Sequence, residues 1–265
     1  MNINEKTLTA IRRKKGFICD MDGVIYHGNH LLPSAVGFLD WLKRAGKRYL
    51  FLTNSSERTP RELRQKLLRL GLDVEEDHFY TSALATAKFL REQSPGCSAF
   101  CIGEAGLINA LYEAGISIND VNPDYVVVGE TQNYNYQNLC KAVRLVAKGA
   151  KLIGTNTDMT GPVEGNVIVP ACRALISPIE LSTGKQAYFL GKPNPLMMRS
   201  GIRHLGCSAA ESAIIGDRMD TDIISGIESG IDTVLVLSGV SGPETVNDFP
   251  YRPTLILEDV GQLAE

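Results

Sequence analysis

The stretch "FICDMDGVIY", residues 17–26, joins an apolar run to two carboxylates that stand one residue apart. The run is typical of a buried β-strand, in which side chains two residues apart point to the same side. Asp20 and Asp22 would therefore crowd two negative charges together, which is unfavourable unless a cation or a shared proton compensates them. A metal site is one interpretation. The other is that the strand ends at Cys19 and both aspartates are solvated turn residues.

Short β-branched runs alternate with helical patterns along the rest of the chain. This alternation predicts an α/β fold, with a parallel sheet covered by helices. The predicted strands are 17–19, 49–52, 100–102, 125–128, 152–153, 188–190, 213–215 and 233–237. The predicted helices are 33–45, 60–70, 107–114, 136–148, 195–204 and 221–228. Several of them open at a proline or a capping residue and end at a glycine, as helices often do.

Length, composition and charge exclude several classes of function. The chain has 265 residues, 44% of them hydrophobic and 22% charged, which is enough for one large or two modest globular domains. A net charge of -3 with dispersed Lys and Arg residues predicts no nucleic acid polymer as a partner. No apolar run approaches the roughly 20 residues that span a bilayer, and no signal peptide is apparent. We therefore expect a cytoplasmic protein without a membrane partner, and the sequence leaves homo-oligomerisation open.

Four polar clusters stand directly after predicted strands or just before predicted helices. They are "DMDG" at 20–23, "TNSS" at 53–56, "GKPNP" at 191–195 and "GDRMDTD" at 216–222. In open α/β sheets the ligand crevice lies at the carboxyl ends of the strands. Each cluster taken singly is as typical of a helix cap or a turn. Together they predict one shared site.

The side chains of these clusters have complementary chemistry. Asp20, Asp22 and Asp217 offer the hard oxygen ligands that Mg²⁺ prefers beside waters and a substrate phosphate. Lys192 offers a compact positive charge, and the second cluster offers a hydroxyl and a backbone N–H. Such a set would cradle a phosphate, and a carboxylate is an accepted nucleophile for phosphoryl transfer through an aspartyl-phosphate.

In order and spacing, the four clusters resemble the four motifs of haloacid dehalogenase superfamily phosphatases. The resemblance covers essentially the whole chain, and "YTSALATAKFL", "NPDYVVVGET", "GTNTD" and "VLSGVS" are similar to its NagD-like branch. That branch carries a large cap between the second and third motifs. The resemblance implies a Rossmann-like parallel-sheet core at 1–84 and 187–265. It also implies a second α/β domain, a cap that selects the substrate, inserted at 85–186.

The resemblance also implies roles for the paired aspartates. Asp20 would be the nucleophile and a metal ligand, and Asp22 the acid that protonates the leaving oxygen and later activates water. Asp22 would bind the metal through its backbone carbonyl, which leaves its carboxyl for proton transfer. Dehalogenases lack this second aspartate, so Asp22 favours hydrolysis of a phosphate ester over attack on a carbon–halogen bond. His27 and His30 follow this motif, and we expect them in a solvated hairpin rather than in a metal site.

The binding roles follow in the same way. The residues implied are Thr53 and Asn54 for orienting the phosphate, Lys192 for neutralising its charge, Asp217 as the third ligand of Mg²⁺, and Asp222 as a support for the metal waters or for Lys192.

Substrate choice is expected in the cap. The loop "GTNTDMTGPVEGN", residues 154–166, follows a predicted strand and is rich in Gly, Asn, Asp and Thr, as a substrate-reading loop would be. An ordinary surface loop is the alternative. We predict that Asn156 and Asp158 contact the leaving group. Since the loop has no Lys, Arg or aromatic residue, the leaving group should be small and carry no second phosphate.

The favoured function is a Mg²⁺-dependent phosphomonoester hydrolase acting on nucleoside monophosphates or a similar small phosphorylated metabolite. Phosphatases for sugar phosphates, phosphoglycolate or p-nitrophenyl phosphate are the alternative. A phospho-acceptor signalling module and a noncatalytic phospho-ligand-binding protein represent different classes. A lone receiver domain is far shorter and has no use for a cap, and pure binding has no use for the general acid Asp22.

Overall fold

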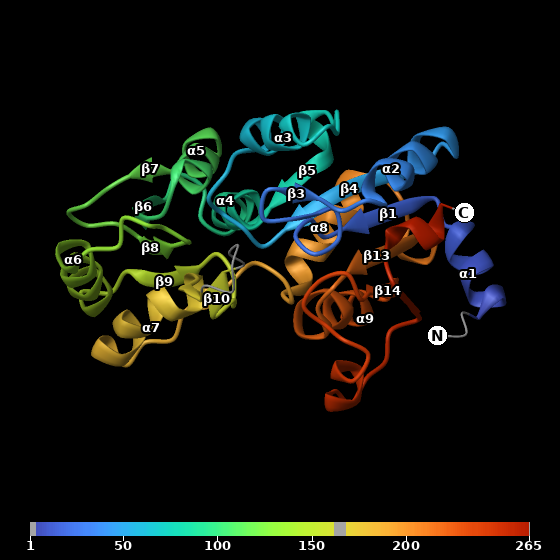
Figure 1. Cartoon of the computed structure of the whole chain (residues 1–265). Coiled ribbons are helices and arrows are strands. Elements are labelled where there is room, and N and C mark those ends of the chain that lie inside the picture. Colours follow the sequence, from blue (N-terminus) through green and yellow to red (C-terminus); the bar gives the residue numbers. More distant parts are fainter. Residues whose placement is uncertain (1–3, 162–167, 265) are drawn as a thin grey trace. The chain divides into compact units, whose positions relative to one another are not determined.

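The computed structural model describes residues 4–161 and 168–264 and divides into two compact units. The first unit consists of Met1–Thr53, Arg64–Tyr80 and Lys192–Glu265, and the second of Asn54–Leu63 and Thr81–Gly191. Both are built from a sheet and helices, which confirms the predicted α/β class (Figure 1). The segment Asn54–Leu63 was not part of the insertion expected at 85–186.

The sheet of the first unit is organised around the opening stretch of the sequence. Its strand order is β15 (Leu255–Leu257), β14 (Asp232–Val236), β13 (Ser212–Gly216), β1 (Gly16–Cys19), β4 (Arg48–Thr53) and β5 (Phe79–Thr81). Strand β1 pairs in parallel with both β13 and β4, and all four of its residues are buried. An uninterrupted apolar run is what a strand covered on both faces requires. After β1 the chain makes a small hairpin of β2 (Tyr26–His27) and β3 (His30–Leu31).

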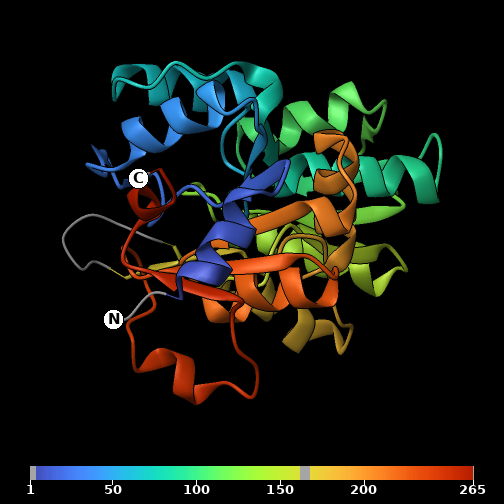
Figure 2. The same ribbon diagram turned by 90° about the vertical axis from the view of Figure 1, so that its right-hand side faces the viewer.

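The first unit also contains helices and short helical turns. They are α1 (Glu5–Arg12), α2 (Ala35–Arg44), α8 (Pro195–Leu205), α9 (Ile224–Glu228), the π-helix η4 (Met219–Ile223) and the short 3-10 turns η1 (Glu76–His78), η3 (Ala209–Glu211), η5 (Thr245–Asp248) and η6 (Val260–Leu263). Helix α3 (Pro60–Arg69) begins in the second unit and ends in the first. Helix α8 packs on β1 and β4, and α9 on β14 (Figure 1). Figure 2 shows α1 beside the C-terminal turn, where Arg12 donates to the carbonyls of Gln262 and Leu263.

The second unit has a parallel sheet of its own. Its order is β12 (Tyr188–Phe189), β9 (Lys151–Gly154), β8 (Tyr125–Val128), β6 (Ser98–Ile102) and β7 (Ser117–Ile118). The helices are α4 (Ser82–Gln93), α5 (Ala105–Glu113), α6 (Tyr136–Ala147) and α7 (Cys172–Thr183). Apolar side chains of α6 and α7 form one core with β6, β8 and β9, and Figure 1 shows α5 on the opposite side of the sheet from α7. A separate pair, β10 (Thr160–Gly161) and β11 (Val169–Pro170), follows β9.

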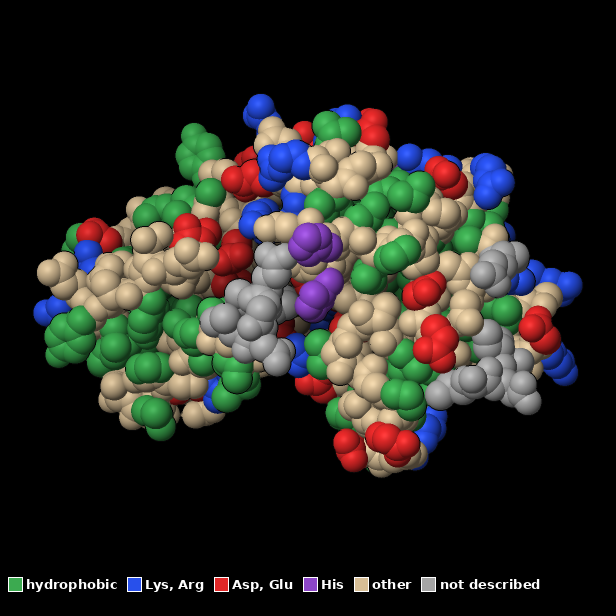
Figure 3. Space-filling model, in the orientation of Figure 1, with side chains coloured by type: hydrophobic (Ala, Val, Ile, Leu, Met, Phe, Trp, Pro, Cys, Tyr) green, Lys and Arg blue, Asp and Glu red, His purple; other side chains and the backbone are tan. Residues whose placement is uncertain are grey.

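The surface carries mixed charge. Figure 3 shows Lys and Arg side chains interspersed with Asp and Glu on the displayed face, in keeping with the net charge of -3. Among the described residues, none of the helices is both long enough and apolar enough to span a membrane.

Candidate active site

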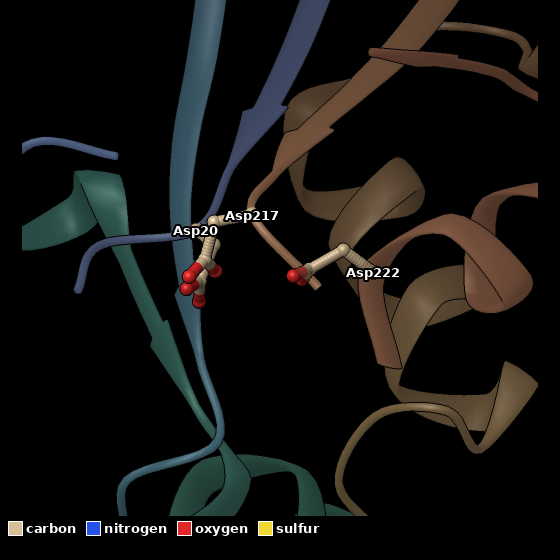
Figure 4. Close-up of side chains that lie close together, drawn as sticks. All are labelled: Asp20, Asp217 and Asp222. Carbon is tan, nitrogen blue, oxygen red and sulfur yellow. The ribbon is translucent and has the colours of Figure 1, made fainter. Parts of the chain in front are cut away.

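Three aspartates meet at one edge of the first sheet. Asp20 directly follows β1 and Asp217 directly follows β13, and because these parallel strands are neighbours their carboxyl ends lie side by side. Figure 4 shows the two carboxylates pointing the same way, with Asp222 directed toward them from η4. One oxygen from each of the three lies within 4.8 Å of the others. Two of the four sequence clusters therefore converge here.

Lys192 brings in the third cluster. Its Nζ donates to Asp20 Oδ1 at 2.6 Å, to Asp222 Oδ1 at 2.7 Å and to the carbonyl of Leu52 at 3.2 Å. The side chains of Lys192, Asp222 and Asp20 are 3%, 1% and 14% exposed. Burial lowers the pKa of Lys192, but the two carboxylates outweigh it and hold that pKa above its ordinary value. The lysine is therefore a fixed positive charge beside Asp20.

Three aspartates share one lysine, and the pKa of each aspartate is raised. Burial raises the pKa of Asp217 to about 8, and the charges of Asp20 and Asp222 add to the effect. Burial also raises the pKa of Asp20, and it raises that of Asp222 to about 6, although Lys192 opposes it in both. Clustered carboxylates that resist ionisation are the donor set that a divalent cation stabilises. The residues present therefore fit a divalent metal ion.

Asp22 lies apart from that cluster. Its Oδ1 is 3.4 Å from Nδ1 of His27, which is on the hairpin strand β2. Burial raises the pKa of Asp22, while the charges of His27 and Lys66 oppose the shift. A carboxyl that keeps its proton closer to neutral pH suits a general acid. The structure places the expected hairpin here, with His27 in contact with the predicted acid.

The second cluster is divided between the two units. Thr53 ends β4 in the first unit, whereas Asn54 is the first residue of the second unit. There the Asn54 amide donates to Asp158 Oδ2 at 3.0 Å, and the Asn54 carbonyl accepts from Asn156 Nδ2 at 2.7 Å. Asn54, predicted to orient the phosphate, thus lies in one hydrogen-bonded group with Asn156 and Asp158, both predicted to contact the leaving group.

This placement bears on the predicted substrate loop. Asn156 is fully buried, and Asp158 is half-buried. A leaving-group contact by Asn156 and Asp158 stays a prediction, but both side chains also hold Asn54. Residues 162–166 of the predicted loop lie outside the described residues.

Comparison with known proteins places these features in a family. Family models match the chain at residues 17–117, described as haloacid dehalogenase-like hydrolase, and at 189–263, described as HAD-hydrolase-like. The chain belongs to the haloacid dehalogenase-like hydrolase family. It is 41% identical over 249 residues to ribonucleotide monophosphatase NagD of Escherichia coli strain K12, covering 94% of this chain and 98% of NagD.

Two further comparisons support the NagD-like branch. Dihydroxyacetone phosphatase of Corynebacterium glutamicum strain R is also 41% identical over 249 residues, with 94% of this chain and 90% of that protein covered. The solved structure of NagD from the E. coli K-12 strain has a TM-score of 0.88 at 42% identity, over 94% of this chain and 97% of NagD. The chain is thus a NagD-like member of a phosphatase branch, and the resemblance seen in the motifs is confirmed.

In this NagD-like hydrolase a loop that sequence reasoning did not place in the site encloses Asp217. The backbone N–H of Val240 donates to Asp217 Oδ2 at 2.7 Å, and Ser238 Oγ donates to the carbonyl of Gly23 at 2.7 Å. A Cβ on Gly23 or on Gly239 would overlap the Asp217 carboxylate. Gly23 also has a φ of 78°, which favours glycine. The one signal in the sequence was "VLSGVS", which gave family resemblance without a role.

Proposed function

We propose that the chain is a Mg²⁺-dependent phosphomonoester hydrolase that works through an aspartyl-phosphate on Asp20. The observation that carries the proposal is the position of Asp20, which lies at the carboxyl end of the central strand. There it is bonded to Lys192 and grouped with Asp217 and Asp222. Membership of a branch whose relatives are named phosphatases supports the same reaction class.

The reaction takes place in two displacements. In the first, a carboxylate oxygen of Asp20 attacks phosphorus, the bond from phosphorus to the leaving oxygen breaks, and Asp22 gives that oxygen its proton. In the second, Asp22 takes a proton from a water whose oxygen attacks phosphorus, and the bond to Asp20 breaks to release phosphate. Lys192 and Thr53 hold the phosphoryl oxygens in line with Asp20, as does Asn54, which follows Thr53 directly in the chain.

Asp20, Asp217 and the backbone carbonyl of Asp22 would hold Mg²⁺, with Asp222 as a support for its waters or for Lys192. The ion would supply positive charge to the phosphoryl oxygens during both displacements. In these roles the residues of the first unit perform the chemistry together with Asn54, the first residue of the second unit. The second unit, as the cap, would contact the leaving group.

Nucleoside monophosphates and similarly small phosphate esters are the proposed substrates. Two of the matched relatives are named ribonucleotide monophosphatase and dihydroxyacetone phosphatase. Both names indicate substrates with small leaving groups, which favours small phosphate esters over polymers as substrates of this chain. The absence of Lys and Arg from the sequence 154–166 supports monophosphates over diphosphates, because a second phosphate would call for added positive charge.

Phosphate release tests the proposal. The substrates are p-nitrophenyl phosphate, nucleoside mono- and diphosphates, dihydroxyacetone phosphate and hexose phosphates, each with Mg²⁺, with EDTA, and with Ca²⁺ replacing Mg²⁺. We expect release from monophosphates to fall at least about 100-fold in EDTA and to return with Mg²⁺. Ca²⁺ should restore little, because its looser and often bidentate coordination turns Asp20 away from in-line attack.

Other outcomes would assign another class. Undiminished turnover in chelator would contradict the metal site. Binding of phosphate esters without release would favour a noncatalytic protein. Stable phosphorylation of the chain without turnover would favour a phospho-acceptor.

A further inference from the structure

The chain that follows Thr53 is packed into the second unit as part of its interior. Ser56 is fully buried. A Cβ on Gly129 would lie 2.5 Å from Ser56 Oγ, and one on Gly106 would lie 2.6 Å from the Ser56 carbonyl. The Gly106 N–H donates to the carbonyl of Glu57 at 2.9 Å. Two close approaches therefore seat this segment against the first turn of α5 and against the residue that follows β8.

Glu130, two residues beyond β8, is hydrogen-bonded to the same segment. Its Oε2 accepts from the Ser56 N–H at 3.0 Å and from the Ser56 hydroxyl. Its Oε1 accepts from the amide of Asn156. Both oxygens thus face donors, which is the pattern that an ionised carboxylate satisfies and an amide cannot.

Through Asn156 the carboxylate of Glu130 reaches Asn54. Asn156 Nδ2 donates both to Glu130 and to the Asn54 carbonyl, and Ser82 Oγ donates to that same carbonyl at 2.5 Å. We call Asn54, Ser56, Ser82, Glu130 and Asn156 the linker clasp.

The linker clasp lies where the chain passes between the units. The passages fall at 53/54, 63/64, 80/81 and 191/192, and the clasp holds Asn54 and Ser82 beside the first and third. At the last, the Gly191 N–H donates to the Thr155 carbonyl at 2.7 Å, and a Cβ on Gly191 would lie 2.7 Å from Asn54 Oδ1. Two of these passages adjoin residues of the phosphate site, Thr53 and Lys192. The clasp residue Asn54 therefore follows Thr53 directly in the chain, and Gly191, which precedes Lys192, packs against Asn54.

We propose that Glu130 is a positioning residue for the reaction, acting through Asn156 and Ser56 to fix the phosphate-orienting Asn54. The proposal rests on the proposed function, in which Asn54 orients the phosphoryl group. Burial raises the pKa of Glu130, and hydrogen bonds from Ser56 and Asn156 oppose part of that shift. One carboxylate oxygen is bonded to Ser56 and the other to Asn156, which in turn holds the Asn54 carbonyl, and this arrangement matches a positioning role.

The test compares Glu130→Gln with a matched change, Glu104→Gln. Glu104 lies in the same unit and accepts from the Thr131 hydroxyl at 2.6 Å and from the Gln132 N–H at 3.3 Å. In Glu130→Gln one of the two accepting oxygens is replaced by an NH₂ group, which faces the donors of Ser56 or Asn156. Two donors cannot bond to each other, so the clasp residues must shift. We expect kcat for p-nitrophenyl phosphate to fall about tenfold or more with KM changed less than about threefold. Glu104→Gln should stay within about twofold of wild type.

Combination with Asn156→Ala distinguishes positioning from general structural damage, because the Asn156 amide joins Glu130 to the Asn54 carbonyl. If Glu130 acts through Asn156, Glu130→Gln should lower kcat by less than about twofold when Asn156 is already alanine. The same factor in both backgrounds would overturn the proposal. If Glu130→Gln does not fold, Ser56→Ala replaces it, since this change removes the hydroxyl but leaves the Ser56 N–H that Glu130 accepts. Its smaller loss of kcat should likewise disappear in the Asn156→Ala background, and a loss that persists there would contradict the role.

Amide hydrogen exchange separates this inference from the proposed function. Exchange of the Ser56 N–H should be faster in Glu130→Gln than in wild type and unchanged in Glu104→Gln. A wild-type chain that hydrolyses no phosphate ester would overturn the proposed function and the positioning role together, whatever the exchange shows. An active wild type whose kcat and Ser56 exchange are both unaltered by Glu130→Gln would overturn the positioning role alone.

Discussion

Asp20→Asn abolishes phosphate release and leaves the fold intact: this is the largest effect that we expect. The amide has the shape of the carboxylate and can still accept a hydrogen bond from Lys192, but it cannot attack phosphorus. Loss of a nucleophile should lower kcat at least about 10³-fold. Because burial raises the pKa of Asp20, its charge opposes folding, and the neutral variant should melt at or above the wild-type temperature.

The measurement is the initial rate with p-nitrophenyl phosphate together with a thermal melt. Asp40→Asn is the control, since Asp40 is exposed on α2, and both its rate and its melting temperature should match wild type. Retention of more than a few per cent of wild-type kcat in Asp20→Asn would remove Asp20 from the role of nucleophile.

Lys192→Met should lose both activity and stability. Methionine fills a similar volume but leaves Asp20, Asp222 and the Leu52 carbonyl without their shared donor. Breaking a buried ion pair from one side costs about 3–5 kcal/mol, which corresponds to a fall of about 10 °C in Tm. Because the variant lacks the positive charge that Lys192 places beside the phosphoryl group, its kcat should fall at least about 100-fold.

A second substitution separates the two effects of Lys192. In Lys192→Met/Asp222→Asn, one of the two carboxylates left without a positive partner becomes a neutral amide. At least half of the decrease in Tm should therefore be reversed, while turnover stays absent. Calorimetry and phosphate release on the same samples give both quantities. Recovery of turnover together with Tm would mean that Lys192 serves folding rather than the phosphoryl group.

The sequence predicted those elements whose burial leaves a local pattern. β1 was recognisable because an apolar run fits a strand covered on both faces. Helix α7 was missed because Pro178 lies inside it, and proline normally breaks a helix. Helix α4 was missed because it buries small residues such as Ala83, Ala85 and Ala87 around much of its circumference, so no polar and apolar faces alternate. The helix predicted at 221–228 is split into η4 and α9.

The residues of the candidate site likewise differ in whether a local sequence pattern indicates them. Asp20, Lys192 and Asp217 could be nominated because each stands in a polar cluster at a strand end, and a parallel sheet brings such ends together. The contact of Val240 with Asp217 uses a backbone N–H, which any residue could provide. The contact of Glu130 with Ser56 joins positions 74 residues apart, and neither residue has a pattern around it that names the other. Contacts of these two kinds become visible only in the folded chain.

The stereochemical course at phosphorus tests the covalent mechanism most directly. A phosphate monoester made chiral at phosphorus with sulfur and oxygen isotopes is hydrolysed in isotopically labelled water, and the configuration of the released thiophosphate is determined. Attack by Asp20 followed by attack of water on the aspartyl-phosphate comprises two in-line displacements, each of which inverts phosphorus. The account therefore predicts net retention of configuration. Net inversion would mean that water attacks the substrate in a single step, and would contradict the assignment of Asp20 as nucleophile.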